Sequence, residues 1–159
     1  MAQTKPFQWY QYEQPLAIPG MKADATEDVI DSYCAAAPMD PGNVVKRGSA
    51  DGLGAPILTA GDLGTAISIV GVAIHTQKDY DGEGAYYKQG DSVPVMSFGD
   101  VYVEAGGTVN AGDAAAVNIT ADGPALVSTA DLGTGIALTG MTFMASGVKG
   151  DIVPLRIRK

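Results

Sequence analysis

The sequence has too few of the residue types on which most catalytic and metal sites depend. Its 159 residues include one cysteine, Cys34, and one histidine, His75. A single cysteine excludes both an intramolecular disulfide and a cysteine-rich zinc site. A Ser-His-Asp triad would have to use His75, and no G-x-S-x-G elbow supplies its nucleophile. We therefore predict no catalytic residue, and we interpret His75 as a structural residue.

Basic residues are also scarce. Ten lysines and arginines stand against 18 acidic residues, which gives a formal net charge of -8. Such a surface repels a phosphate backbone, so nucleic acid is not an expected partner. The last basic residues are Arg156, Arg158 and Lys159. We interpret them as the solvated end of a strand.

Long apolar runs are absent. The longest one, residues 67–74, is interrupted by Ser68 and Gly71 and is far too short to span a bilayer. The first residues lack the apolar stretch and the cleavage site of a secretory signal. We expect neither a membrane partner nor secretion.

Binding motifs for phosphates and cations are missing or incomplete. No P-loop occurs, and the glycines between residues 48 and 54 lack the spacing of a dinucleotide fingerprint. Asp79, Asp81 and Glu83 imitate the start of a calcium loop, but Gly90 stands where its glutamate is required. We predict a loop of solvated acids with no metal or cofactor, and whether these three residues hold a cation stays open.

Glycine and turn signals are abundant. The chain contains 21 glycines and nine prolines in a 46% apolar composition, which predicts many short strands joined by tight turns. Five Gly-Asp pairs fit this interpretation, since glycine tolerates positive φ and aspartate caps its own turn. These pairs begin at Gly61, Gly90, Gly99, Gly112 and Gly150. We predict an all-β fold for residues 21–159, a single compact β-sandwich or flattened barrel.

Hydrophobic patterning locates the strands. Residues 67–75 are apolar on both faces, which indicates a strand between two packed layers. Residues 24–37 fit either a short helix or a strand. Pro94 and Pro154 lack an N–H, so their strands are expected to be edges or bulged at those positions. Further strands are predicted over residues 92–96, 101–104, 114–119, 125–129, 141–146 and 152–158.

Residues 1–20 differ from the rest of the chain. Phe7, Trp9, Tyr10 and Tyr12 alternate with glutamines among three prolines, which predicts an extended arm. Aromatic side chains on a segment without its own core need a surface to cover them. We consider the parent domain and a neighbouring subunit as that surface, so these four residues are the candidate contact residues.

The ordered set of these segments resembles the structural cement, or decoration, proteins of tailed-bacteriophage capsids. The resemblance covers about four fifths of the chain, with the aromatic N-terminus matching least, and it favours a strand for residues 24–37. The segments that carry it are residues 71–78, 87–95, 99–103, 109–113, 141–147 and 152–157.

The resemblance implies a structural virion protein and no enzyme. It implies binding to the major capsid protein on the outer capsid surface, bridging of neighbouring capsomers, and self-association, with a homotrimer favoured over a dimer. Such a protein is made in the host cytoplasm, and Phe7, Trp9, Tyr10 and Tyr12 become candidate capsid or intersubunit contacts. A carbohydrate- or cell-surface-binding β-domain of a virion remains the alternative, with the arm and residues 78–87 as its stacking surface.

Overall fold

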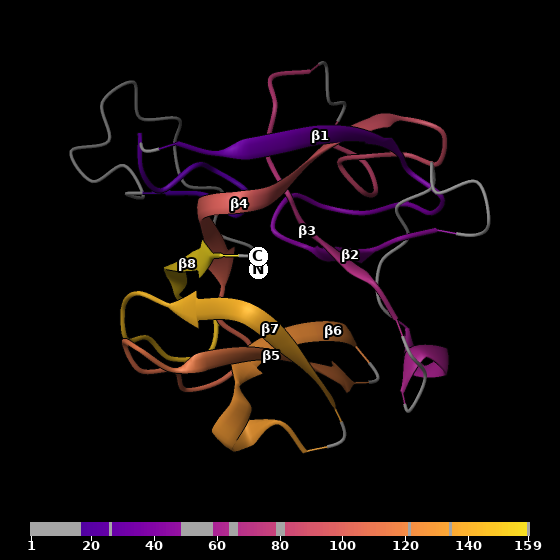
Figure 1. The fold of residues 1–159 in the computed structure, drawn as a ribbon. Coiled ribbons are helices and arrows are strands. Elements are labelled where there is room, and N and C mark those ends of the chain that lie inside the picture. The colour runs from indigo at the N-terminus through magenta and orange to yellow at the C-terminus, as the bar shows by residue number, and fades with distance from the viewer. Residues whose placement is uncertain are drawn as a thin grey trace, which may run out of the picture.

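The structure confirms the all-β prediction. The computed structural model describes residues 17–25, 27–48, 59–63, 67–78, 82–120, 122–133 and 135–158. They form one antiparallel sheet curled into a half-barrel (Figure 1). The strands are β1 (Val29–Cys34), β2 (Val44–Lys46), β3 (Ile69–Ala73), β4 (Ser92–Glu104), β5 (Ala114–Thr120), β6 (Gly123–Ser128), β7 (Gly135–Phe143) and β8 (Ile152–Ile157).

The strand order is β2-β3-β4-β8-β7-β5-β6, and β1 pairs separately with β4. Two 3-10 helices, η1 (Ala60–Asp62) and η2 (Thr129–Asp131), complete the described elements. No helix in the described part of the chain is long and apolar enough to cross a bilayer.

Strand β4 organises the sheet, because its two halves have different neighbours. Its first half pairs with β1 and β3, and its second half pairs with β8. The prediction of two short strands separated by a Gly99–Asp100 turn is therefore wrong. Gly99 has a φ of 134°, and a Cβ there would lie 2.8 Å from the Met96 sulfur. Glycine lets the strand bend at this point without ending (Figure 1).

The open question over residues 24–37 is settled in favour of a strand. β1 pairs in antiparallel register with β4, with Tyr33 opposite Val93 and Ser32 opposite Pro94. The helical spacing of the apolar residues is overridden by the hydrogen-bonding edge that β4 offers. The interpretation of residues 67–75 as a strand covered on both faces is also confirmed, since β3 is buried from Val70 to Ala73.

Four turns share one conformation. Each contains a glycine with φ between 90° and 93°, namely Gly42, Gly90, Gly112 and Gly150. The residue that follows the glycine uses a side-chain oxygen to accept a hydrogen bond from the backbone N–H of the residue three positions before it. The acceptors are Asn43 (2.9 Å), Asp91 (2.8 Å), Asp113 (3.0 Å) and Asp151 (2.9 Å). The next residue begins β2, β4, β5 or β8, so the turn interpretation is confirmed for three of the five Gly-Asp pairs.

These turns occur as two matching pairs. Met39 and Tyr87 exchange backbone hydrogen bonds of 3.0 and 2.9 Å ahead of the first pair. Val109 and Gly147 do the same, at 2.9 and 3.0 Å, ahead of the second pair. Val109 follows Met39 by 70 residues, and Gly147 follows Tyr87 by 60.

The strands repeat with the same offsets. The Tyr33 to Val93 pair of β1 and β4 reappears as the Val103 to Val153 pair of β4 and β8. The pairs of β2 with β3 and of β3 with β4 reappear as β5 with β7 and β7 with β8. The described chain therefore contains two structural repeats that share β4: its first half closes repeat one and its second half opens repeat two. β6 is an addition within repeat two.

The two prolines occupy equivalent places in the repeats. Ile74, directly after the end of β3, donates its N–H to the Pro94 carbonyl at 2.9 Å. Met144, directly after the end of β7, does the same to Pro154 at 2.8 Å. β4 and β8 have neighbours on both sides, so they are not edge strands as a whole. Each proline instead lies where the neighbouring strand ends, so its missing N–H leaves no gap within a paired stretch.

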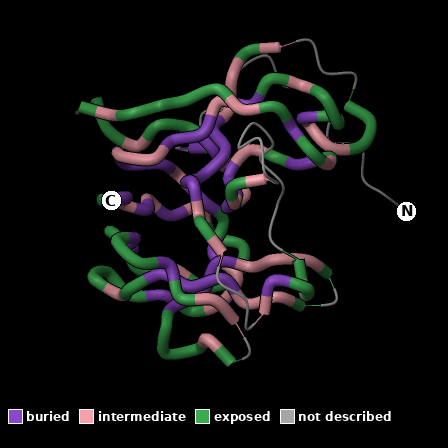
Figure 2. The backbone as a smooth tube through the Cα atoms, turned by 45° about the vertical axis from the view of Figure 1, so that its right-hand side comes forward, coloured by how far each residue is buried: buried purple, intermediate pink, exposed green. Residues whose placement is uncertain are grey.

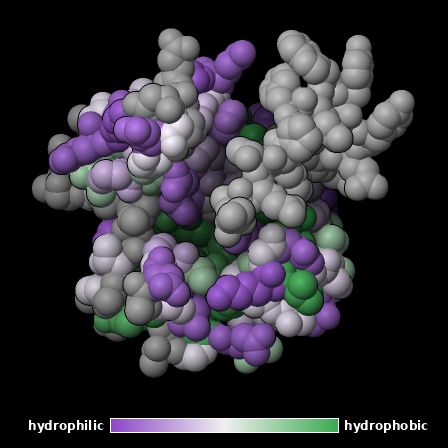
Figure 3. All heavy atoms as spheres, turned by 180° about the vertical axis from the view of Figure 1, so that it is seen from behind, coloured by the Kyte–Doolittle hydropathy of each residue, from purple (hydrophilic) through white to green (hydrophobic). Residues whose placement is uncertain are grey.

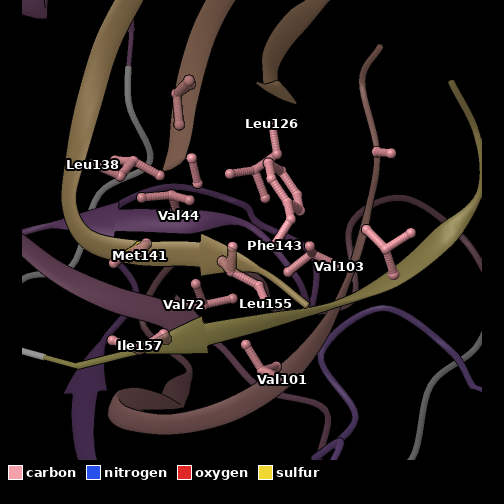
Figure 4. Packing of buried hydrophobic residues seen from close by; sticks show 14 of the residues in the cluster. Val44, Val72, Val101, Val103, Leu126, Leu138, Met141, Phe143, Leu155 and Ile157 are labelled. Atoms are coloured by element: carbon pink, nitrogen blue, oxygen red, sulfur yellow. The ribbon is translucent and has the colours of Figure 1, made fainter. Parts of the chain in front are cut away.

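Apolar side chains form two clusters that β4 connects. The smaller one lies in repeat one and includes Tyr87, Val93 and Val95. The larger one draws on both repeats, with Phe143 and Leu155 among its fully buried members (Figure 4). Figure 2 shows this burial following the strands, with exposed residues gathered in the turns and along β1. Along β8 the pattern alternates regularly, as predicted for a half-buried final strand.

Candidate functional site

The predicted contact residues Phe7, Trp9, Tyr10 and Tyr12 lie outside the described residues, so their role stays a prediction. The described chain begins at Ala17, which is buried. What the structure does place is the end of the predicted arm and its continuation into the domain.

A short segment, Gly20 to Ala23, lies against the second half of β4 and is called the strap below. Gly20 donates its N–H to Tyr102 (2.7 Å), Tyr102 donates to Met21 (2.8 Å), and Ala23 donates to Asp100 (2.8 Å). The strap therefore covers the backbone edge of β4 opposite β8. The chain enters the strap from Pro19, which with Glu104 is among the residues that line the cavity described below.

The predicted cation loop is placed only in part. Asp79 and Asp81 lie outside the described residues, and Glu83 is exposed. Within the described ranges, no three His, Cys, Asp or Glu side chains are grouped in a way that would hold a metal ion. Whether Asp79, Asp81 and Glu83 hold a cation therefore stays open.

Around His75, aromatic and charged side chains fasten the loop that follows β3. The rings of His75 and Tyr86 lie 4.9 Å apart, and Lys78 Nζ lies 5.2 Å from the Tyr87 ring centre. Lys78 also contacts Asp91 at 2.5 Å. Tyr87 is fully buried, and its hydroxyl donates to the Ile74 carbonyl at 2.6 Å. These contacts tie the loop to the turn before β4, in agreement with a structural role for His75.

The C-terminal arginines form an ion-pair site that sequence reasoning missed. Arg156 donates to both carboxylate oxygens of Asp100, with Nη2 to Oδ2 at 2.7 Å and Nε to Oδ1 at 3.0 Å. Arg158 adds a contact of 3.2 Å. The hydrogen bond from Arg156 holds the pKa of Asp100 below its ordinary value.

The interpretation of Arg156 and Arg158 as a solvated strand end is correct only in part: Arg158 is exposed just after β8 and Arg156 is half-buried, but both also contact Asp100. Their partner, Asp100, is buried, with 6% of its surface exposed, and it lies directly opposite Arg156 in the pairing of β4 with β8. Only the alternation along residues 152–158 hinted at this arrangement, because it places both arginines on one face. Lys159 lies outside the described residues.

A cavity of about 380 Å³ lies between the two repeats. One wall is the turn from Asp40 to Asn43, and the opposite wall is the hairpin of β5 and β6. Figure 3 shows apolar surface in a hollow between polar surfaces above and below. The lining includes neither histidine nor cysteine, and its charged groups are Asp40, Glu104, Asp122 and Lys149.

Large apolar side chains are exposed mainly near the start of the described chain. Among the described residues, four of the six large exposed ones fall between residues 18 and 30. These are Ile18, Met21, Val29 and Ile30, with 40%, 47%, 47% and 37% of their surface exposed. They belong to the arm's end, the strap and β1, so this part of the molecule offers the most apolar contact surface.

Comparison with known proteins gives a family and a fold. Residues 6–158 match the family described as structural cement protein (E217 gp24/Pam3 gp6). A chain in the solved capsid of Myoviridae phage XM1 is 16% identical, with a TM-score of 0.75 over 98% of this chain and 99% of that one. The head fiber gp8.5 N base of bacteriophage phi29 is 18% identical, with a TM-score of 0.42 over 83% and 95%. No curated protein matches.

Proposed function

The chain belongs to the structural cement proteins of phages, and from this premise we propose that it binds the outer surface of a capsid lattice and bridges neighbouring capsomers. The observation that carries the proposal is the family match over residues 6–158. The partner is then the major capsid protein, and the protein acts on the virion surface after its synthesis in the host cytoplasm. We propose no catalytic role, since the family is structural.

Self-association is part of the proposal. We propose a homotrimer, in line with the resemblance noted from the sequence. An oligomer that touches several capsomers loses its contacts one at a time, so modest individual interfaces give tight retention. About 800 Å² per partner at each contact suffices for a specific interface.

The described fold supports a scaffold role. Four turns of one conformation and a continuous sheet hold the loops at fixed positions, and the Asp100 to Arg156 pair ties β4 to β8 where the repeats meet. Such a framework presents contact surfaces with little loss of conformational entropy on binding.

The aromatic arm is the proposed capsid or intersubunit contact, through Phe7, Trp9, Tyr10 and Tyr12. Aromatic side chains are enriched at the centres of interfaces, where they bury a large area with few rotatable bonds. The exposed apolar side chains of Ile18 and of Met21 in the strap continue this contact surface into the described domain.

The proposal is tested with capsids that lack this protein. Purified protein is added, the capsids are sedimented, and bound protein is measured together with the temperature at which the capsids release DNA. We expect saturable binding and a higher release temperature. Protein that stays in the supernatant at micromolar concentration contradicts the proposal.

A further inference from the structure

The outer edge of β1 offers backbone groups for pairing. Ala35 bonds to the turn before β4 at Gly90 and Asp91, both at 2.8 Å, which sets the side of β1 that faces β4. Because backbone groups alternate along a strand, Tyr33 and Asp31 also face β4. Ile30, Ser32 and Cys34 therefore turn their N–H and C=O groups outward. Within the described residues, no strand or bridge pairs with that edge.

The second repeat shows how the same edge is filled. The counterparts of Ile30 and Ser32, 70 residues later, are Asp100 and Tyr102. Both use their outward groups to bond the strap: Asp100 accepts from Ala23, and Tyr102 exchanges bonds with Gly20 and Met21. Among the described residues, equivalent edges of the two repeats are thus covered in one case and unpaired in the other.

Among the described residues, this edge has little of the usual protection. Exposed edges in natural proteins are blunted by lysine, proline, bulges or a covering segment. β1 contains neither lysine nor proline, its one charged residue is the exposed Asp31, and Val29 and Ile30 expose 47% and 37% of their surface. A bulge occurs between Val29 and Ile30, but it leaves the edge from Ile30 to Cys34 regular. An edge of this kind is suited to accept an added strand.

We propose that this edge binds residues 7–14 from the arm of a neighbouring copy. That stretch has eight residues bounded by Pro6 and Pro15, which is long enough to follow the six residues of β1. Phe7, Trp9, Tyr10 and Tyr12 are residue types enriched in strands, and they would cover Val29 and Ile30. The strap, which directly follows the arm in the sequence, already pairs with a strand edge through backbone hydrogen bonds to β4.

The path of the chain favours a neighbour's arm over its own. Residues 20–34 follow β4 progressively, with Gly20 beside Tyr102 and Cys34 opposite Ser92. The arm precedes Gly20, so it leaves from the end of this path that is farthest from β1. Exchange in which each copy gives its arm to the next is head to tail, and it closes into a ring such as the proposed trimer when the rotation between copies closes. The inference thus deepens the self-association within the proposed function, and it can fail while capsid binding holds.

Crosslinking in the full-length chain tests the proposal. In a Cys34→Ser background, Ser32→Cys is combined in turn with Gln8→Cys, Tyr10→Cys or Tyr12→Cys, and the protein is oxidised under native conditions. We expect at least one pair to give disulfide-linked oligomers on a non-reducing gel. The matched control replaces Ser32→Cys with Thr108→Cys, an exposed position in repeat two, and gives none. Crosslinks that are intramolecular only, or no crosslinks with any arm cysteine, overturn the proposal.

Ser32→Pro provides an independent test by mass. It removes only the outward N–H, because Ser32 lies opposite Pro94 and its backbone groups face away from β4. Light scattering after gel filtration is expected to show a monomer for Ser32→Pro and the wild-type oligomer for Ser32→Ala. An unchanged oligomer with Ser32→Pro, or a wild-type protein that is itself monomeric, overturns the proposal. Cosedimentation of the same variants with capsids shows separately whether capsid binding remains.

Discussion

Arg156 and Asp100 lie opposite each other on β8 and β4, and the guanidinium contacts both carboxylate oxygens at 2.7 to 3.2 Å. The pair joins β4 to β8 near the point where the first repeat ends and the second begins. The Gly99–Asp100 pair has the sequence pattern of a turn, and Arg156 belongs to the basic residues at the end of the chain. The ion pair connects these two segments.

Removing the carboxylate should destabilise the protein in a pH-dependent way. Asp100→Asn is expected to lower the free energy of unfolding at pH 7 by about 1.5–3 kcal/mol, the usual range for a hydrogen bond to a charged group. Arg156 lowers the pKa of Asp100 in the folded state. This contribution is therefore present above the unfolded pKa near 3.9 and is lost as pH falls through the lower folded pKa.

Urea unfolding of wild type and Asp100→Asn at pH 7 and at pH 3 checks this. The gap between the two proteins should narrow at pH 3. Asp31→Asn, an exposed acid on β1, serves as the control and should change little. A gap that is the same at both pH values would contradict the assigned ion pair.

Tyr87→Phe should remove a buried hydrogen bond and alter the alkaline limb of stability. The hydroxyl donates to Ile74 at 2.6 Å, so its loss leaves a buried carbonyl unsatisfied at a cost of about 1–3 kcal/mol. Burial raises the pKa of Tyr87. The neutral phenol thus stabilises the fold below the unfolded pKa near 10, and this stabilisation is lost as pH rises through the folded pKa.

Equilibrium unfolding of wild type and Tyr87→Phe between neutral pH and pH 11 measures both effects. Above pH 10 the wild type should lose stability faster than the variant. Equal slopes would show that Tyr87 ionises as readily in the folded chain as in the unfolded one.

Gly71→Ala should be far more damaging than Gly90→Ala. A Cβ on Gly71 would lie 1.9 Å from the Met96 carbonyl oxygen, so β3 and β4 would have to separate. A Cβ on Gly90 meets no atom within 4 Å, and only its φ of 90° is unfavourable. That strain costs about 1–2 kcal/mol. Thermal unfolding should show a modest shift for Gly90→Ala and a severe loss, or no folded protein, for Gly71→Ala. A reversed order would contradict the close crossing of the two strands.

Deletion of residues 1–14 should separate folding from attachment. The strap and β1 begin beyond the deletion, so the truncated chain is expected to keep its circular dichroism spectrum and a cooperative unfolding transition. Its retention on capsids during sedimentation should fall, because the aromatic contacts are removed. Wild-type retention by the truncated protein would remove the arm from the mechanism.

The sequence predicted the fold class and most strand positions, because turn chemistry and alternation are local signals. It did not predict that β4 is continuous through Gly99 and Asp100, since a Gly-Asp pair has the same local signature in a turn and in a bent strand. The helical spacing in residues 24–37 likewise competed with a strand whose partner lies more than 50 residues away.

The two repeats were hidden for a different reason. They agree in hydrogen bonding and register, but Met39 corresponds to Val109 and Tyr87 corresponds to Gly147. The side chains therefore differ between the repeats wherever their packing differs. The sequence features that the repeats share are the glycine-centred turns and the Val-Pro pairs at residues 93–94 and 153–154. The ion pair was missed because Asp100 and Arg156 lie 56 residues apart in the sequence and meet only through strand pairing.

A reconstruction of the virion at side-chain resolution tests the central claim most directly. We predict density for this fold on the outside of the capsid, in contact with at least two neighbouring capsomers. Its absence from the outer surface, or contact with one capsomer alone, would contradict a cement function.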